Sequence, residues 1–138
     1  MLRIIAATNN QGKVFEIKKI CENLPIDICS LKDIGLSIDV EEDQPTFEGN
    51  AAKKAVEVMK ETGHIALADD SGLEVDILDG KPGVLTARFA GPHATDQENN
   101  KKLLDLLNGV PAEKRKAVFR CFMVLACPNG EIFKAEGS

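Results

Sequence analysis

The stretch Ile65–Leu78, IALADDSGLEVDIL, is the strongest indication of the fold, because it combines a strand pattern with two adjacent aspartates. A short apolar run, IALA, stops at two adjacent aspartates and a Ser-Gly pair, and a segment of alternating apolar and acidic residues follows. Four to eight apolar residues bounded by a turn signal are typical of a buried strand. The pattern predicts that Asp69 and Asp70 lie at a strand end near the surface. Because neighbouring carboxylates repel each other, either the pair faces water as an ordinary turn or a positive group binds there.

Length and composition bound the class of protein. A chain of 138 residues, 43% hydrophobic and 28% charged, is typical of one globular domain, residues 1–138. The net charge of −5 and the lack of Trp and Tyr argue against a nucleic-acid binder, but a single nucleotide needs only a few lysines and a metal. No run reaches transmembrane length, and the chain opens on a strand pattern instead of a signal peptide. We therefore expect a cytoplasmic protein without a membrane partner.

The N-terminal region predicts a strand, a polar loop and a helix. Residues 2–7 (LRIIAA) form a continuous apolar run, and TNNQGK occupies residues 8–13. Such a loop offers free backbone N–H groups and the positive end of a helix dipole to an anion. Lys13 is unfavourable at a first helical turn unless it faces a phosphate; an Asn-capped helix with an exposed lysine is the alternative. The helix would place on one face Val14, Ile17, Ile20 or Cys21, and Leu24, and would end at Pro25.

The next region predicts two strands and a second helix. Residues 26–31 alternate as in a strand, residues 36–40 form a weaker one, and residues 33–35 form a turn between them. Thr46 is the expected N-cap of a helix over residues 47–61, which Gly63 would end.

An acidic cluster, Glu41-Glu42-Asp43, precedes this helix, which carries Lys53 and Lys54. Acidic residues at a helix entrance are often only solvated and favourable to the dipole. The functional alternative is a second carboxylate for a metal whose first carboxylate is at the paired aspartates.

The C-terminal half predicts one more helix and a hairpin. Residues 80–83 form a turn, and residues 84–91 are short and mixed, with Arg88 as either an ion-pair partner or an anion contact. Residues 117–126 predict a long strand that turns at Pro-Asn-Gly into residues 131–135. A Thr-x-x-Glu capping box at Thr95 starts a helix whose expected inward residues are Leu103, Leu104, Leu106 and Leu107. The whole predicts an α/β domain with a mixed sheet.

The remaining chemistry-bearing residues receive no catalytic role. The cysteines show neither a CxxC pair nor metal-ligand spacing, and each lies in an apolar run, which favours small buried hydrophobic residues in a reducing compartment. His64 and His93 lie in expected loops. The cysteines are Cys21, Cys29, Cys121 and Cys127.

Three polar segments together indicate a phosphate chemistry. They are the loop with Lys13, the acids Glu41 and Glu42, and the aspartate pair with Ser71. Mg²⁺ is typically held by one or two carboxylates plus substrate phosphates. A nearby carboxylate can orient or deprotonate a water for attack on phosphorus. The combination predicts phosphoanhydride hydrolysis without a covalent intermediate.

Three blocks of the chain resemble the inosine triphosphate/xanthosine triphosphate pyrophosphatase family. They are TNNQGK, EEDQPTFEGNA and ADDSGLEVDILDGKPGVLTARFAG, with Thr86 where the family has Ser, and similarity continues through FRCFMVLACPNG. The resemblance implies an α/β fold with a long, bent mixed sheet, two lobes with a central cleft, and a homodimer. It also implies Mg²⁺-dependent hydrolysis of ITP, dITP and XTP to the monophosphate and pyrophosphate, with Mn²⁺ as an alternative metal.

By position, the resemblance assigns Asp70 as catalytic base and metal ligand, supported by Asp69. Glu42, or else Glu41, would be the other metal carboxylate. Ser71 and Lys54 would contact the substrate. The phosphates would be held by Thr8, Asn9, Asn10, Gln11, Gly12 and Lys13.

Family features that read the purine base, an FGYDP-type stretch and a Ser-His-Arg motif, do not occur in these residues. We therefore expect a C-terminally truncated product that retains the phosphate and metal half. Two alternatives remain open: a Maf-type nucleotide pyrophosphatase, and an inactive nucleotide-binding fragment. An aspartyl-phosphate phosphatase is disfavoured because its D-x-D pair would stand where TNNQGK lies.

Overall fold

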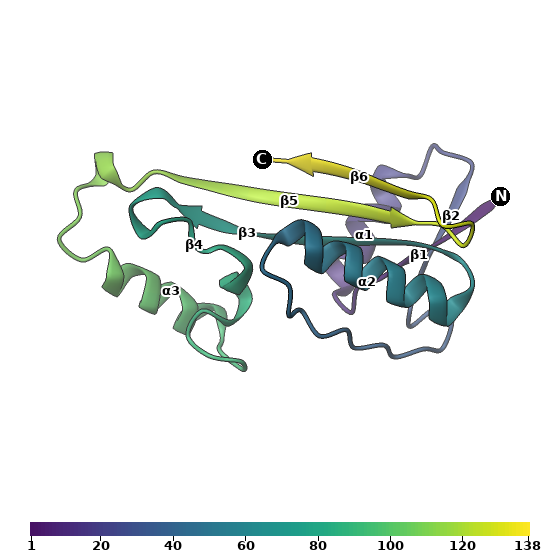
Figure 1. The fold of residues 1–138 in the computed structure, drawn as a ribbon, viewed down its shortest axis with the longest axis horizontal. Coiled ribbons are helices and arrows are strands. Elements are labelled where there is room, and N and C mark those ends of the chain that lie inside the picture. Colours follow the sequence, from purple (N-terminus) through teal and green to yellow (C-terminus); the bar gives the residue numbers. More distant parts are fainter. The chain divides into compact units, whose positions relative to one another are not determined.

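The computed structural model describes residues 1–138 and has a mixed α/β architecture (Figure 1). Five strands follow the order β2-β1-β3-β5-β6 in a six-stranded sheet, and β4 pairs with β3. Parallel pairs (β1 with β2 and β3) and an antiparallel pair (β3 with β4) confirm the predicted mixed sheet. In chain order the elements are β1 (Leu2–Ala6), α1 (Gln11–Ile20), β2 (Ile26–Ser30), α2 (Phe47–Thr62), β3 (Ile65–Val75), η1 (Asp76–Leu78), β4 (Lys81–Pro82), η2 (Gly83–Arg88), α3 (Asp96–Leu106), η3 (Ala112–Lys114), β5 (Ala117–Ala126) and β6 (Ile132–Gly137).

The chain divides into two compact units, in agreement with the two lobes that the resemblance implies. Unit 1 comprises Met1–Asp69 and Phe122–Ala135, and unit 2 comprises Asp70–Cys121 and Glu136–Ser138.

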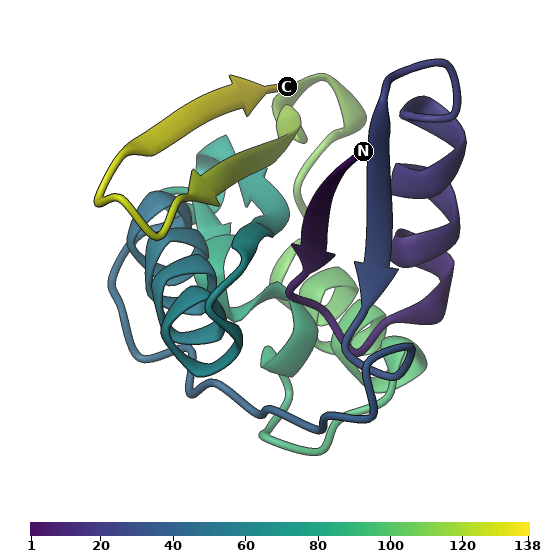
Figure 2. The same ribbon diagram turned by 90° about the vertical axis from the view of Figure 1, so that its right-hand side faces the viewer.

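Parallel strands form the centre of unit 1. β1 pairs with β2 along its whole length and with the beginning of β3. Strands of a parallel sheet are usually covered on both faces, and here α1 and α2 cover opposite faces (Figures 1 and 2). Because side chains alternate along a strand, Ile4 packs in the cluster that contains Val14 of α1. Ile5 packs in the other cluster, which contains Ala55 and Val58 of α2.

β3 is longer than the sequence predicts. It runs unbroken from Ile65 to Val75, so Asp69 and Asp70 lie within a strand, and the predicted strand end is wrong. The strand continues past the Ser-Gly pair because it gains new partners. Glu74 and Val75 pair with β4, and the amide of Leu73 donates to Thr86 Oγ1 over 3.0 Å.

The two helices of unit 1 are present with their N-caps, but α1 ends at Ile20, before the predicted end at Pro25. Asn10 caps α1, and Thr46 caps α2 by accepting a hydrogen bond from the amide of Gly49 over 3.0 Å. α2 extends one residue beyond the prediction, to Thr62, and ends at Gly63, whose φ of 70° is left-handed.

Other local predictions are wrong. Residues 36–40 form no strand, and there the side chain of Asn9 donates to the Ile38 carbonyl in place of a strand ladder. Cys21, the C-cap of α1, packs inward as one of the two predicted alternatives, Ile20 is 79% exposed, and Leu24, which lies beyond the helix, is exposed against prediction.

In α3, the inward positions follow a spacing of four residues, Asn99, Leu103 and Leu107, so a polar residue occupies one of them. Leu104 and Leu106 are therefore exposed, against prediction.

α3 holds the preceding segment of unit 2. The predicted capping box is present: Thr95 Oγ1 accepts from the amide of Glu98, whose carboxylate accepts from the amide of Thr95. Asn99 is buried; its Oδ1 accepts from the amide of Ala90 over 2.8 Å, and its Nδ2 donates to the carbonyl of Ala87 over 3.0 Å. Lys102 Nζ donates to the carbonyl of Phe89 over 2.8 Å and lies 4.5 Å from the Phe89 ring centroid.

The C-terminal hairpin is confirmed. β5 has the predicted bounds, and the turn closes through a hydrogen bond from the amide of Cys127 to the carbonyl of Glu131 over 2.9 Å. The second strand, β6, is shifted to Ile132–Gly137.

None of the four cysteines forms a disulfide, and all are half-buried, so the predicted full burial is only partly correct. Burial raises the pKa of the Cys29 thiol. None of the helices is both long enough and apolar enough to cross a membrane.

Candidate active site

The loop between β1 and α1 is folded on itself. Asn10 Oδ1 accepts from the amides of Gly12 (2.9 Å) and Lys13 (3.2 Å), and the Asn10 amide donates to Thr8 Oγ1 over 3.1 Å. A Cβ at Gly12 would lie 3.1 Å from Asn10 Oδ1, so glycine allows this close approach. The amides of Gly12 and Lys13 are therefore engaged by the cap, as in the Asn-capped alternative, and phosphate binding by this loop stays a prediction.

Lys13 reaches the first aspartate of the pair. Its Nζ lies 2.6 Å from Asp69 Oδ2, across 56 positions of sequence. The Asp69 side chain is 10% exposed and that of Lys13 is 36% exposed. Of the two alternatives for the aspartate pair, the structure shows a positive group at Asp69, and that group is Lys13 itself.

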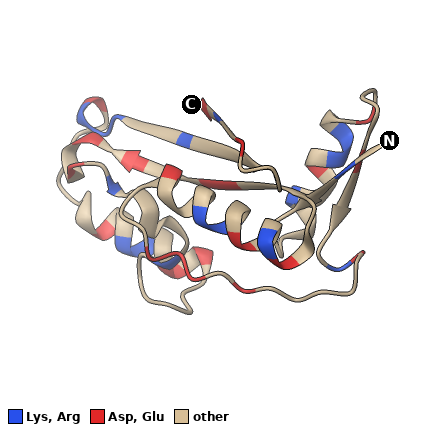
Figure 3. Ribbon diagram, turned by 45° about the vertical axis from the view of Figure 1, so that its right-hand side comes forward, with Lys and Arg blue, Asp and Glu red and all other residues tan.

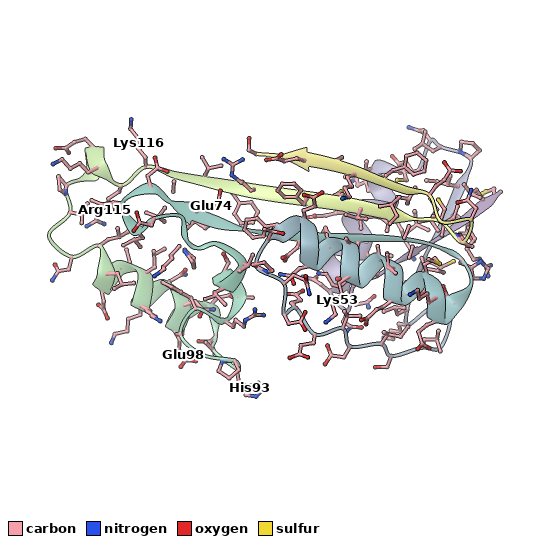
Figure 4. The ribbon with its side chains drawn as sticks, viewed as in Figure 1. Lys53, Glu74, His93, Glu98, Arg115 and Lys116 are labelled. Carbon is pink, nitrogen blue, oxygen red and sulfur yellow. The ribbon has the colours of Figure 1, made fainter.

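The acidic segment before α2 is held by basic residues of that helix. Lys54 Nζ lies 2.8 Å from Glu42 Oε1. Lys53 Nζ donates to the carbonyl of Glu41 over 2.8 Å and to Asp43 Oδ1 over 2.9 Å. The hydrogen bond from Lys53 lowers the pKa of the Asp43 carboxyl, and the same contact raises the pKa of Lys53. Acidic and basic positions gather along this segment and α2 (Figure 3), and Lys53 extends from the helix toward the segment (Figure 4).

A cavity of about 210 Å³ joins two of the predicted segments within unit 1. Thr8 and Asn9 come from the loop after β1, Glu42 comes from the acidic segment, and Lys54 comes from α2. The remaining lining residues are Ala7, Leu31, Ile38, Asp39, Val40 and Val58. Hydroxyl, amide, ammonium and carboxylate groups on one cavity wall can bind a phosphate together with its counter-cation.

The second aspartate of the pair begins unit 2. Asp70 is buried, and Ser71 beside it is half-buried. Because successive side chains of a strand point to opposite faces, Asp70 shares the face of Ala66 and Ala68, whereas Asp69 shares the face of Leu67. The two carboxylates therefore have different surroundings although they are adjacent in sequence.

Two carboxylates, Asp39 and Glu42, line the cavity of unit 1. No group of three or more His, Cys, Asp or Glu side chains is arranged to hold a metal ion. Mg²⁺ usually keeps several waters and takes only one or two carboxylates besides substrate phosphates. Glu42, which lines the cavity of unit 1, is a carboxylate that suits a metal of that kind.

Sequence reasoning missed two residues that shape the site. Asn50 is fully buried; its Oδ1 accepts from the amide of Gln44 over 2.9 Å, and its Nδ2 donates to the Gln44 carbonyl over 3.3 Å. Gly49 lies where a Cβ would be 3.0 Å from Gln44 Cβ. The available signal was a glycine and an asparagine, two poor helix formers, in consecutive positions within a predicted helix.

The chain is similar to proteins of known name along nearly its whole length. Proteins named dITP/XTP pyrophosphatase from Desulforamulus reducens and Geobacter sulfurreducens are each 50% identical over 137 residues, which is 99% of this chain and 68% and 69% of theirs. These matches favour the resemblance to the inosine triphosphate/xanthosine triphosphate pyrophosphatase family over the Maf-type alternative.

Solved structures agree with the sequence matches. A HAM1 protein from Coxiella burnetii superposes with a TM-score of 0.90 at 36% identity, over 99% of this chain and 70% of that chain. A nucleoside-triphosphatase/dITP/XTP pyrophosphatase from Mycobacterium abscessus has a TM-score of 0.85 at 40% identity, over 99% and 71%. The model of the Ham1 family matches residues 4–138. The fold, the similar proteins and the family match agree, and the chain belongs to the Ham1 family.

Proposed function

We propose that this chain hydrolyses non-canonical purine nucleoside triphosphates (ITP, dITP and XTP) to the monophosphate and pyrophosphate, and so cleanses the nucleotide pool. The observation that carries the proposal is 50% identity over 99% of the chain to proteins named dITP/XTP pyrophosphatase. The cavity in unit 1, with its lysine and carboxylate, supports the same chemistry.

Phosphate binding is assigned to the loop after β1 and to two lysines. Thr8 and Asn9 line the cavity together with Lys54, and Lys13 brings a second positive charge next to the same loop. Gly12 and Asn10 keep the loop in its compact turn, and Gln11 begins the helix. An ammonium group acts on phosphate as a point charge, so two lysines partly offset the charge of the polyphosphate.

Magnesium is the proposed cofactor, with manganese as a substitute, and Glu42 is the proposed ligand from the acidic segment. The side chain of Glu42 is half-buried and lines the cavity, whereas Glu41 is exposed and its carbonyl is bound by Lys53. This contrast favours Glu42. When bound, the metal would neutralise charge on the phosphates.

Asp70 is the proposed general base and second metal carboxylate. Its neighbour Asp69 is occupied by Lys13, which gives Asp69 a supporting role. Asp70 would accept a proton from the attacking water, whose oxygen bonds to the α-phosphorus while the bond to the bridging oxygen breaks and pyrophosphate leaves. Ser71, the next residue in β3, is the proposed substrate contact.

The remaining assignments concern the setting of the enzyme. We propose a cytoplasmic homodimer that acts on free nucleotides and not on nucleic acid or membranes. The net charge of −5 supports a small nucleotide over a polyanion. Light scattering coupled to size exclusion would measure the oligomeric state, and a monomer at micromolar concentration would contradict the dimer.

The deciding experiment measures pyrophosphate release from ITP and from ATP, with and without Mg²⁺, for the unmodified chain and for Asp70→Asn. We expect Mg²⁺-dependent release from ITP over ATP, and a loss of about 10²- to 10⁴-fold in Asp70→Asn, since a general base contributes that much. The matched control is Asp76→Asn, which neutralises an exposed aspartate shortly after β3 and should retain activity.

Two outcomes would contradict the proposal. A folded chain that releases no pyrophosphate would be the inactive fragment considered above. Cleavage of phosphomonoesters with ITP left intact would indicate a different hydrolase.

A further inference from the structure

The acidic segment that carries Glu42 has no backbone ladder to hold it. Residues 36–45 contain no helix or strand, and an irregular segment keeps a fixed position only where its polar groups find partners. A metal carboxylate on such a segment therefore depends on side chains from elsewhere for its position.

Asn50 supplies a backbone partner, in addition to the ion pair of Lys54 with Glu42. It is fully buried, and its single amide group binds both the N–H and the C=O of Gln44, two residues after Glu42. A side-chain amide is the group that presents an acceptor and a donor side by side, so a carboxylate in its place would lose the donor and a methyl would lose both.

Gly49 makes this approach possible. It lies in a helix with an ordinary φ, where glycine costs roughly 1 kcal/mol relative to alanine. A Cβ there would lie 3.0 Å from Gln44 Cβ and 3.1 Å from Thr46 Oγ1. The glycine thus gives up helix stability for contact between Gln44 and the helix.

Lys53 adds a second attachment. It lies three residues after Asn50, on a neighbouring position of the helix surface, and its Nζ binds the Glu41 carbonyl and the Asp43 carboxylate. Glu42 therefore lies between Glu41 and Asp43, which Lys53 binds. The residue after Asp43, Gln44, is bound by Asn50.

We propose that Asn50, with Gly49 and Lys53, is a positioning residue that holds the Glu42 carboxylate in place for the metal. This inference rests on the proposed function. It adds that Asn50 would influence metal affinity through the position of Glu42, although its own side chain is buried and bound to the Gln44 backbone.

The test compares Asn50→Asp with Asn99→Asp, which makes the same change in a buried asparagine with the same pair of backbone contacts. In Asn50→Asp we expect the Mg²⁺ concentration for half-maximal pyrophosphate release to rise by about tenfold or more. We expect faster hydrogen exchange at the Gln44 amide. In Asn99→Asp the Ala90 amide should exchange faster, while the Mg²⁺ requirement stays unchanged.

A binding measurement separates this proposal from the proposed function. Binding of Mn²⁺ in the presence of α,β-methylene-ITP, followed by electron paramagnetic resonance, should weaken by about tenfold in Asn50→Asp whether or not the chain turns over ITP. If the chain is inactive but this weakening is found, the positioning role stands and the proposed activity fails.

Lys53→Met keeps the test decisive if Asn50→Asp does not fold, because the Lys53 side chain is partly exposed and its loss should spare the core. It should weaken Mn²⁺ binding in the same direction. Unchanged Mn²⁺ binding in the folded Asn50 or Lys53 variant, an equal change in Asn99→Asp, or no Mn²⁺ binding by the unmodified chain would overturn the proposal.

Discussion

α2 of unit 1 and α3 of unit 2 begin with the same arrangement of residues. Each is capped by a threonine, carries a buried asparagine four residues later and a lysine three residues after that. In both helices the asparagine binds one backbone N–H and one C=O, and the lysine binds a backbone carbonyl of the segment before the helix. The shared pattern is T-x-x-x-N-x-x-K, at Thr46, Asn50 and Lys53 and at Thr95, Asn99 and Lys102.

The two helices differ at the residue before the asparagine. α3 has Glu98, which completes a capping box, whereas α2 has Gly49, which cannot. Unit 2 thus uses the position to stabilise its own helix, and unit 1 uses it to bring a neighbouring segment closer. The segment so held carries Glu42, so the glycine of unit 1 exchanges local helix stability for close contact with an acidic segment.

The largest expected difference is in the rate of pyrophosphate release after one acidic side chain near α2 or α3 is neutralised. Glu42→Gln should lower pyrophosphate release by about 10²- to 10³-fold, because a metal ligand supplies several kcal/mol of charge stabilisation. Glu98→Gln, the matched change on α3, should retain the rate. Steady-state assays with ITP at saturating Mg²⁺ would measure both. Equal losses of pyrophosphate release in Glu42→Gln and Glu98→Gln would contradict a functional difference between the two helices.

A smaller effect is expected from truncating the two asparagines. Asn50→Ala and Asn99→Ala each leave a backbone N–H and C=O without a partner, so each should lower the free energy of unfolding by about 1–3 kcal/mol. Asn50, at 0% exposure against 8% for Asn99, should lie at the higher end. Urea unfolding followed by circular dichroism would measure this. A neutral Asn50→Ala would show that the segment does not depend on the contact.

The glycine gives a change of unusual sign. In an exposed helix interior, Gly→Ala stabilises by roughly 1 kcal/mol, but Gly49→Ala should destabilise because its Cβ would meet Gln44 and Thr46. Gln44→Gly removes two of the three opposing atoms, Cβ and Cγ of Gln44, so the double variant should recover part of the loss. Thermal unfolding of the four proteins tests this, and a more stable Gly49→Ala would refute the close-approach argument.

The smallest expected effect is on the pH dependence of stability. Hydrogen bonds lower the pKa of Asp43, mainly from Lys53, and of Glu98, mainly from the Thr95 amide, below their ordinary values of 3.8 and 4.5. A lowered folded-state pKa contributes stability above the unfolded value, and this contribution is lost as the pH falls through the folded value. The stability difference between the unmodified chain and Glu98→Gln should therefore shrink from pH 7 to pH 3. A difference independent of pH would exclude ionisation of Glu98 as its source.

Local chemistry predicted the helix ends well. Thr46, Gly63 and Thr95 act within one turn of sequence, and all three are confirmed as caps. The inward residues of α3 were predicted poorly because periodicity expects leucine where the structure buries Asn99. A hydrophobic pattern cannot reveal that a polar residue will be fully hydrogen-bonded in the core.

The candidate site was predictable in composition but not in pairing. The aspartate pair left open whether water or a positive group faces it, because Lys13 and Asp69 are 56 residues apart and meet only where β1 pairs with β3 in unit 1. The prediction ended the strand near Asp70 because Ser-Gly is a turn signal in sequence. That signal is overridden when the residues after it find hydrogen-bond partners. β4 and Thr86 supply those partners.

The ion pairs Lys13–Asp69 and Lys54–Glu42 have a consequence for selectivity. Each lysine of the proposed phosphate site carries its own tethered counter-ion, so an incoming anion must compete with a carboxylate of high effective concentration. An anion of low charge gains little by displacing one carboxylate from its lysine. A triphosphate could displace both carboxylates at once, and a metal ion that binds with it could take up one of the displaced carboxylates. In the proposed phosphate site, these two ion pairs would therefore favour a triphosphate over simple inorganic anions.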